Sequence, residues 1–239
     1  MNLQSRSYQK EIMDQSDYTY EEFSECLDQI NVINRWTQGY QPIISQLNSY
    51  YKKGFFSEGK FSLLDVGSGL GDTLREIENW AKVRNLSVKL TGVDLNPWCV
   101  DLARQKTNSE NIEYIQSNAF DLDPEITGKY DFVVNSLFTH HLNDEEIVEL
   151  LKWMTRTSVM GWMINDLHRH PVPYYFIKGV TRALDANRLI QNDAPLSVAR
   201  SFTKSDWKSF INLSGIDSSK VEIKWHWSFR HCVHYSHIL

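Results

Sequence analysis

The sequence predicts an α/β fold in which helices cover both faces of a mostly parallel sheet. Short apolar runs of strand length alternate with helical patterns between residues 61 and 166. This alternation is typical of parallel βαβ units with right-handed crossovers. A glycine-rich turn directly follows the first of these strands. The length of 239 residues suits a single domain of this class.

Two helices are expected before the first strand. Thr19 and Glu22 have the spacing of a capping box, and apolar residues follow them at helical intervals. Pro42 suits the first turn of a second helix. Residues 1–58 are therefore expected to form a helical cap on the domain.

The alternating part of the chain forms the expected core, residues 59–166. Asn96 and Pro97 provide an N-cap and a first helical residue, and Asn143 with Glu146 begins a later helix. The expected strands are 61–66, 88–93, 112–116, 130–135 and 159–166. The expected helices are 72–83, 97–107 and 143–155.

The rest of the chain lacks this alternation of strands and helices. Residues 167–200 contain three prolines, a Tyr-Tyr-Phe run and one expected helix, and we interpret them as an insertion that covers the substrate. In residues 201–239, a capping pair begins another helix, and the β-rich runs 221–229 and 230–238 are expected at the edge of the sheet.

Composition excludes several classes of function. The net charge of −5 and the pI near 5.9 provide no electrostatic footprint for nucleic acid. No apolar stretch reaches the length of a membrane span, and the polar N-terminal residues are unlike a secretory signal. Cys26, Cys99 and Cys232 are too far apart for a disulfide framework or a zinc motif. A cytoplasmic location is expected.

The strongest motif is LLDVGSGLGD, residues 63–72, between a strand and a helix. Gly67, Gly69 and Gly71 lack the Cβ atoms that would keep a ligand away from the backbone at the helix N-terminus. The spacing is GxGxG, whereas dinucleotide-binding dehydrogenases have GxGxxG. A tight strand-to-helix connection without a ligand is the alternative explanation.

The second and third strands also end in polar residues. Asp94, in LTGVDLNP, can accept hydrogen bonds from both ribose hydroxyls of an adenosine ligand. A capping Asp in an ordinary loop is the alternative. Asn118 can bind the amino group of adenine, beside backbone contacts at Ala119, although Asn is also a common turn residue.

The fourth and fifth strands bring histidines to the same edge of the sheet. His140 and His141 follow the fourth strand, where a general base would be useful. A structural role is an equal alternative for His140 and is favoured for His141. Asp166 ends the fifth strand and His168 follows it, and we expect a hydrogen-bonding role for one of them, with loop anchoring as the alternative.

Taken together, these motifs resemble class I S-adenosylmethionine-dependent methyltransferases. The resemblance rests on Asp65 to Gly71, Asp94, the segment 118–121 and YDFVVNSLFTHHL, and covers about residues 60–165. It implies a Rossmann-like sheet of seven strands, the last antiparallel, with S-adenosylmethionine across the carboxyl ends of the first two. Asp65 and Gly67 would hold the methionine end of this cofactor. Asn118 departs from the family, which often has Asp there.

A looser resemblance indicates the chemical class of the methyl acceptor. The segments THHL, NDLHRHPVPYYF and LSVARSFTKSDW are similar to methyltransferases found beside type III polyketide synthases or in quinone and aromatic-lipid pathways. This implies a hydrophobic phenolic or enolic acceptor, with O-methylation favoured. INVINRWTQGYQPIISQL is similar to the same group, which makes Arg35 a candidate for the cofactor carboxylate; an exposed helix Arg is the slightly favoured alternative.

The expected catalytic residues are His140, Asp166 and His168. No metal is expected, because no second cluster is spaced to complete a ligand set and methyl transfer from a sulfonium needs no Lewis acid. An NAD-dependent oxidoreductase and a cofactor-binding domain without turnover remain as alternatives. The expected partner is an aromatic or polyketide-like small molecule and not nucleic acid, and the oligomeric state stays open. The expected cofactor-binding residues are Arg35, Asp65, Gly67, Ser68, Gly69, Gly71, Asp94, Leu95, Asn118, Ala119 and Asn135.

Overall fold

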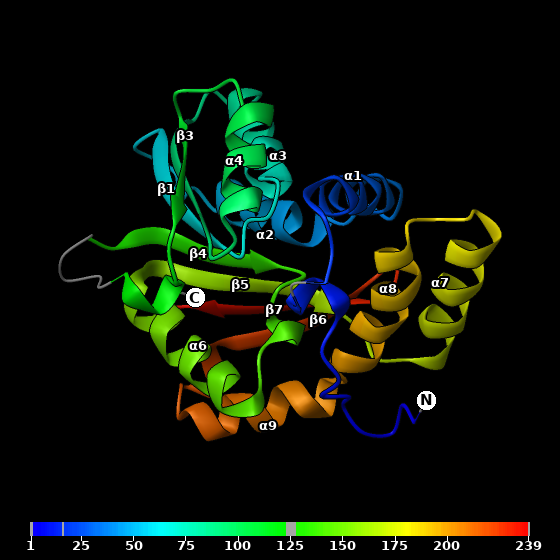
Figure 1. Cartoon of the computed structure of the whole chain (residues 1–239). Coiled ribbons are helices and arrows are strands. Elements are labelled where there is room, and N and C mark those ends of the chain that lie inside the picture. The colour runs from blue at the N-terminus through cyan, green and yellow to red at the C-terminus, as the bar shows by residue number, and fades with distance from the viewer. Residues whose placement is uncertain (1, 16, 123–127, 239) are drawn as a thin grey trace.

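The computed structural model describes residues 2–15, 17–122 and 128–238 and contains a seven-stranded sheet (Figure 1). The strand order is β3-β2-β1-β4-β5-β7-β6. β7 runs antiparallel to both of its neighbours, and all other pairings are parallel. The predicted sheet is therefore confirmed. The strands are β1 (Lys60–Val66), β2 (Ser87–Asp94), β3 (Ile112–Gln116), β4 (Tyr130–Ser136), β5 (Ser158–Leu167), β6 (Val221–His226) and β7 (Arg230–Ser236).

Helices cover both faces of this sheet, as expected (Figure 1). The α-helices of the described part are α1 (Tyr20–Trp36), α2 (Gln41–Lys52), α3 (Asp72–Lys82), α4 (Pro97–Lys106), α6 (Asp144–Thr157), α7 (Pro171–Ala183), α8 (Arg188–Arg200) and α9 (Lys204–Ser214). Its short 3₁₀ helices are η1 (Ile12–Asp14), η2 (Ala119–Asp121), η3 (Thr139–His141) and η4 (Ser218–Lys220).

The two faces of the sheet have separate apolar cores. Successive side chains of a strand point to opposite faces, so Leu63 packs with α2, α3 and α4, while Leu64 packs with α6 and α9. α2 thus belongs to the layer on the sheet. A third cluster joins α1, η1 and α8.

Local signals place most helix ends correctly. Thr19, Asn143 and Thr203 each form the predicted capping box with the acidic residue three positions later. Asn96 accepts a hydrogen bond from the backbone of Trp98 and caps α4. Each of these caps satisfies amide groups that would otherwise lack a partner in the first helical turn.

The segment 167–200 differs from the prediction, because it contains two helices instead of one. Pro195 lies inside α8, where proline normally breaks a helix. The helix continues because one of its faces is buried, with Leu189 and Ile190 packed against α1 and Val198 packed against Tyr174 of α7. Tertiary packing outweighs the local propensity here.

The two final strands also differ in position. Both were expected at the edge of the sheet, but β7 lies between β5 and β6, and only β6 is an edge strand. Every residue of β7 is buried, whereas β6 contains no buried residue. A strand buried along its whole length needs neighbours on both sides.

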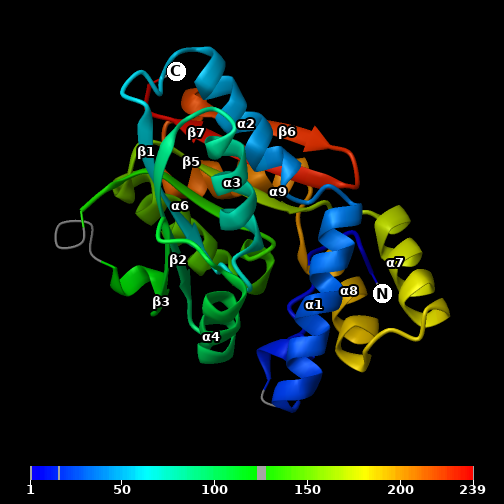
Figure 2. The ribbon, with the colours of Figure 1, turned by 90° about the horizontal axis from the view of Figure 1, so that it is seen from above.

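The carboxyl ends of β1, β2, β4 and β5 meet at one edge of the sheet, and α1, α7 and α8 lie beyond that edge (Figure 2). Open α/β sheets bind ligands at this edge. In the described part of the chain, every helix is too short or too polar to cross a membrane.

We expect acid to destabilise the fold partly through His234. This buried imidazole contacts Gln46 Nε2 at 2.6 Å and the Tyr50 hydroxyl at 2.7 Å, and burial lowers its pKa to about 4. The unfolded chain, with a His pKa near 6.5, binds the proton first, so stability is full above pH 6.5 and falls towards pH 4. The difference corresponds to about 3 kcal/mol at low pH. Urea unfolding between pH 7 and 4.5 should show a smaller loss in His234→Gln; equal slopes would contradict this role.

Candidate active site

The turn after β1 depends on its glycines for two different reasons. Gly67 and Gly71 have φ angles of 68° and 75°, and a Cβ at either position would overlap with the Phe138 ring or the Tyr114 hydroxyl. By contrast, no described atom lies within 4 Å of a Cβ built at Gly69, which has a φ of 52°. Two glycines therefore permit the tight turn, and the third leaves open space beside the N-terminus of α3.

Two polar side chains at this turn lack partners. Asp65 Oδ1 and Ser68 Oγ are buried without a hydrogen-bond partner among the described residues. Burial, and then the neighbouring Asp94 carboxylate, raises the pKa of Asp65 well above its usual range. Unpaired buried polar atoms are costly, so the turn is suited to a ligand that donates hydrogen bonds or carries positive charge.

Asp94 is fixed at the tip of β2. Its Oδ2 accepts a hydrogen bond from Gly69 N at 2.9 Å, and its Oδ1 accepts one from Asn96 N at 2.9 Å. Burial raises the pKa of Asp94, and these backbone hydrogen bonds partly offset the rise. The carboxylate is thus held rigidly against the glycine turn, and each oxygen keeps a second lone pair for a ligand.

The residues that follow β2 and β3 present a mixed surface. The Leu95 side chain is 70% exposed directly beside Asp94. Asn118 is exposed, but its Oδ1 accepts a hydrogen bond from Phe120 N and caps η2, while Ala119 is buried. The capping role that was the alternative for Asn118 is therefore present, and its oxygen keeps a second lone pair for a ligand.

Two further residues of the predicted set have other contacts. The fully buried Asn135 side chain accepts a hydrogen bond from Thr139 at 2.8 Å and contacts the Met154 sulfur, so it braces the loop after β4. Arg35 is exposed and lines a shallow surface groove with Glu76 of α3. The structure shows no contact between Arg35 and the glycine turn.

His140 and Asp166, predicted from different strands, form a buried pair. The His140 Nδ1 and Asp166 Oδ1 atoms lie 2.8 Å apart, and the backbone N–H of His140 donates to Asp166 Oδ2 at 3.0 Å. Burial alone would raise the pKa of Asp166, but the His140 ring and the hydrogen bonds outweigh it and lower this pKa. If His140 Nδ1 donates its proton to Asp166, the lone pair of the ring lies on Nε2. The Asp166 carboxylate thus orients His140 as a base.

His168 lies in a different cluster. Its ring packs against His170, His231 and Phe229, and its Nδ1 is buried without a partner among the described residues. Burial and the neighbouring His170 and Arg169 lower its pKa. The three predicted catalytic residues thus divide into the His140–Asp166 pair and a separate His168.

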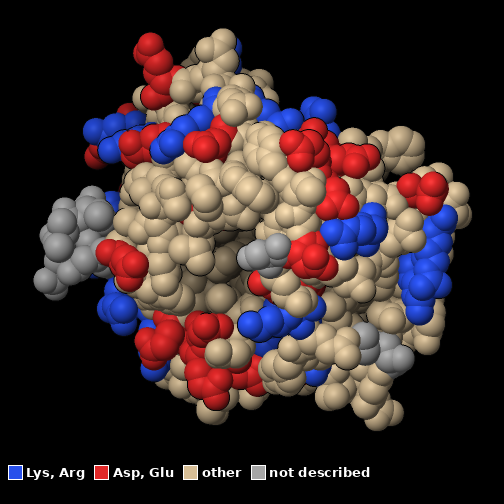
Figure 3. Space-filling model, in the orientation of Figure 1, with Lys and Arg blue, Asp and Glu red and all other residues tan. Residues whose placement is uncertain are grey.

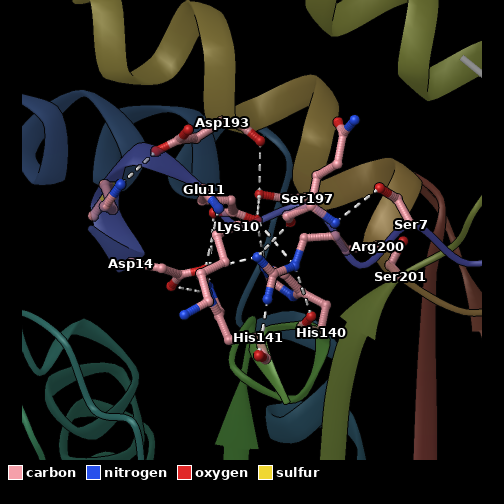
Figure 4. Close-up of polar contacts among 12 residues, drawn as sticks. Ser7, Lys10, Glu11, Asp14, His140, His141, Asp193, Ser197, Arg200 and Ser201 are labelled. Carbon is pink, nitrogen blue, oxygen red and sulfur yellow. Dashed lines mark hydrogen bonds and ion pairs between the residues drawn. The ribbon is translucent and has the colours of Figure 1, made fainter. Parts of the chain in front are cut away.

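The N-terminal segment covers His140, which sequence reasoning did not detect (Figure 4). Arg6 donates to the carbonyl oxygens of His140 and Leu142, and Arg200 of α8 also donates to the His140 carbonyl. Glu11 is 3% exposed, and its carboxylate lies 3.9 Å from His140 Nε2. No sequence motif connects residues so far apart along the chain.

The surface is hollowed on this side of the molecule. Figure 3 shows the hollow near the centre of the view, close to where the arrow of β4 ends in Figure 1, with uncharged residues around much of its rim. A small molecule therefore has an approach to this edge of the sheet.

Comparison with known proteins agrees with the fold. A sequence family described as a methyltransferase domain matches residues 63–160. A protein provisionally named as a protein N5-glutamine methyltransferase, from Methanocaldococcus jannaschii, is 30% identical over 120 residues, which are 49% of this chain and 57% of that protein. The match thus spans little more than half the length of this curated relative.

Solved structures show the same architecture. The plantazolicin methyltransferase BpumL, in complex with SAH, has a TM-score of 0.62 at 15% identity, over 90% of this chain and 95% of its own. Human N-acetylserotonin methyltransferase, in complex with SAM, has a TM-score of 0.59 at 17% identity, over 91% of this chain and 57% of its own. The glycine turn and Asp94 lie within the matched residues 63–160, which resemble a methyltransferase domain, and the fold of the chain is that of the class I S-adenosylmethionine-dependent methyltransferases.

Proposed function

We propose that the chain transfers the methyl group of S-adenosylmethionine to a small hydrophobic acceptor with a phenolic or enolic hydroxyl group. The observation that carries this proposal is the open glycine turn between two acids, Asp65 and Asp94, close to an oriented His–Asp pair at the ends of β4 and β5. The turn is suited to bind the cofactor, and the His140–Asp166 pair is suited to take the proton that the acceptor must lose.

The residues of the turn fit the cofactor. An ammonium group at Asp65 would favour the ionised carboxylate and so offset the cost of its burial. Asp94 has lone pairs for the ribose hydroxyls, and the exposed Leu95 provides an apolar surface beside it for the adenine ring. Gly69 leaves the N-terminus of α3 open to the polar part of the ligand.

The protein has two tasks in this reaction. When bound, the cofactor supplies an activated methyl group on a sulfonium, which is a good leaving group. The chain must align the acceptor oxygen with that methyl group and remove the acceptor's proton. Alignment alone contributes about 7–11 kcal/mol in favourable intramolecular reactions.

His140 is proposed to take the proton. With Nδ1 donating to Asp166, the Nε2 lone pair is available, and the Asp166 carboxylate stabilises the charged ring that results. A phenol, with a pKa of about 10, is acidic enough for an imidazole base near neutral pH, whereas an amide N–H is far less acidic. This difference favours an oxygen acceptor, although the curated relative is named for a glutamine nitrogen.

The acceptor is proposed to enter from the side of the N-terminal segment and α7. His140 is 3% exposed, so an acceptor reaches its Nε2 only if the segment carrying Glu11 moves aside. On α7, Val172, Tyr175 and Phe176 remain at least half exposed and offer apolar cover. This supports a hydrophobic acceptor and the covering role predicted for residues 167–200.

Ligand-dependent melting tests the cofactor assignment. We expect S-adenosylhomocysteine to stabilise the chain and NAD to have no effect, because the turn has the GxGxG spacing and an acid at the tip of β2. At a hundredfold excess over Kd, the stabilisation is about 2.7 kcal/mol. A thermal shift with NAD alone would instead indicate an oxidoreductase.

Turnover is tested separately with a panel of phenols. Release of S-adenosylhomocysteine in the presence of one of them would support the proposed transfer. Cofactor binding without product from any phenol or enol would indicate either another acceptor or a domain without turnover. Amide acceptors, assayed in parallel, distinguish these two cases.

A further inference from the structure

At the proposed base, three side chains from two distant parts of the chain face one another. Glu11 lies in the N-terminal segment, while His140 and His141 form the end of η3 (Figure 4). One donor atom from each of these residues lies within 4.8 Å of the other two. The Nε2 atoms of both histidines are 3.9 Å from the Glu11 carboxylate, each from a different oxygen.

Both rings are oriented by a second carboxylate. His140 Nδ1 lies 2.8 Å from Asp166 Oδ1, and His141 Nδ1 lies 2.8 Å from Asp14 Oδ1. A donor at Nδ1 fixes the lone pair on Nε2, which faces Glu11. Histidines that bind metals are typically held in this way, with the other ring nitrogen on a carboxylate.

The charges around the cluster favour a cation. Glu11, Asp14 and Asp166 are three carboxylates, and Arg200 is the guanidinium that contacts Asp14 at 2.6 Å. Arg6 lies nearby, but Asp144 balances its charge at 2.7 Å. The buried Arg230 adds a positive charge beside Asp166, so with both imidazoles neutral one negative charge, that of Glu11, remains unbalanced.

Glu11 itself is poorly satisfied. One serine hydroxyl, from Ser197, donates to its carboxylate at 2.9 Å, and Arg200 Nε lies at 3.8 Å, beyond hydrogen-bond distance. The Arg200 N–H groups instead donate to Asp14 and to backbone carbonyl oxygens. A buried carboxylate with so few donors is costly unless a cation or a proton joins it.

We propose that Glu11, His140 and His141 form a binding site for a divalent transition-metal ion of the zinc class. Two imidazoles and one carboxylate are a common ligand set for zinc, with one position left for water or a substrate oxygen. Tetrahedral zinc ligands lie about 3.3 Å apart, so the 3.9 Å separations need only a small contraction of the side chains.

The site has a consequence for methyl transfer, and this consequence rests on the proposed function. A metal ion on His140 Nε2 would occupy the lone pair proposed to accept the acceptor's proton. The ion and the proton would therefore compete for one nitrogen, and the metal would inhibit the transfer. Metal binding itself is independent of turnover and is measured without cofactor or acceptor.

Cobalt titration of the chelator-treated chain tests the site. We expect one equivalent of Co²⁺ to bind, with the strong visible absorption of a four-coordinate ion, and Zn²⁺ to displace it. Mg²⁺ should not compete, because it prefers oxygen ligands in octahedral geometry. Failure of the parent chain to bind either Co²⁺ or Zn²⁺ would overturn the proposal and would show that protons balance the cluster instead.

Matched variants locate the bound ion. Glu11→Gln and His141→Asn should each weaken Co²⁺ binding by at least about tenfold. His170→Asn is the control, because His170 lies in the other histidine cluster and Asn preserves its N-cap of α7. Melting curves of the variants check that each is folded. Parent-like binding in both Glu11→Gln and His141→Asn, or a loss confined to His170→Asn, would contradict the assignment.

Discussion

Replacing His140 with Asn should lower methyl transfer by about 10²–10⁴-fold, the usual contribution of a general base, while cofactor affinity stays within about twofold of the parent. Asn keeps the polarity of the position but has no nitrogen that titrates near neutral pH. The acidic limb of the pH–rate profile should move or disappear with the imidazole. The assay requires an acceptor identified from the phenol panel, and a chelator keeps metal ions from His140.

The control for this experiment is His141→Asn. His141 is adjacent in sequence, but its side chain is 29% exposed and contacts Asp14 rather than Asp166. It should retain turnover and the parent pH profile in the presence of chelator. If His140→Asn instead loses stability and its folded fraction keeps the parent profile, His140 is structural. Full turnover with an unchanged profile would leave alignment as the main catalytic contribution.

Local signals predicted the fold well because they act within a few residues. The capping boxes at Thr19, Asn143 and Thr203 each satisfy backbone groups in their own helix, so their effect does not depend on distant contacts. The two helices of 167–200 were missed in part because Pro195 reads as a helix breaker. Only its tertiary environment, packed against α1 and α7, shows otherwise.

For the candidate site too, contacts between nearby parts of the sequence could be predicted, and contacts between distant side chains could not. Asp65, the glycine turn and Asp94 lie within about thirty residues, and the βαβ connection brings them to one edge of the sheet. The same reasoning brought His140 and Asp166 to that edge, but their hydrogen bond follows from side-chain orientation that no spacing fixes. Glu11 and Arg200 reach His140 through the folding of segments that are more than fifty residues away in the sequence, for which the sequence has no local signal.

The acid at the tip of β2 should contribute most to cofactor affinity. Replacing Asp94 with Ala removes a charged acceptor, and hydrogen bonds to charged groups contribute about 1.5–3 kcal/mol. We therefore expect the Kd for S-adenosylhomocysteine to rise by about 10- to 150-fold in calorimetry. The variant should also be less stable than the parent, because the backbone amides of Gly69 and Asn96 lose their hydrogen-bond acceptor.

Two further variants separate these effects. Asp94→Asn retains one oxygen acceptor of nearly the same shape but no charge, so it should lose affinity with a smaller loss of stability. Asp101→Ala removes an exposed acid of α4 whose carboxylate lies 3.7 Å from Arg104, and this variant should bind as the parent does. If Asp94→Ala remains folded with unchanged affinity, the ribose is held by other groups. Equal losses in Asp94→Ala and Asp101→Ala would point to a general effect of net charge, whereas a loss confined to the Asp94 variants places the ligand at the tip of β2.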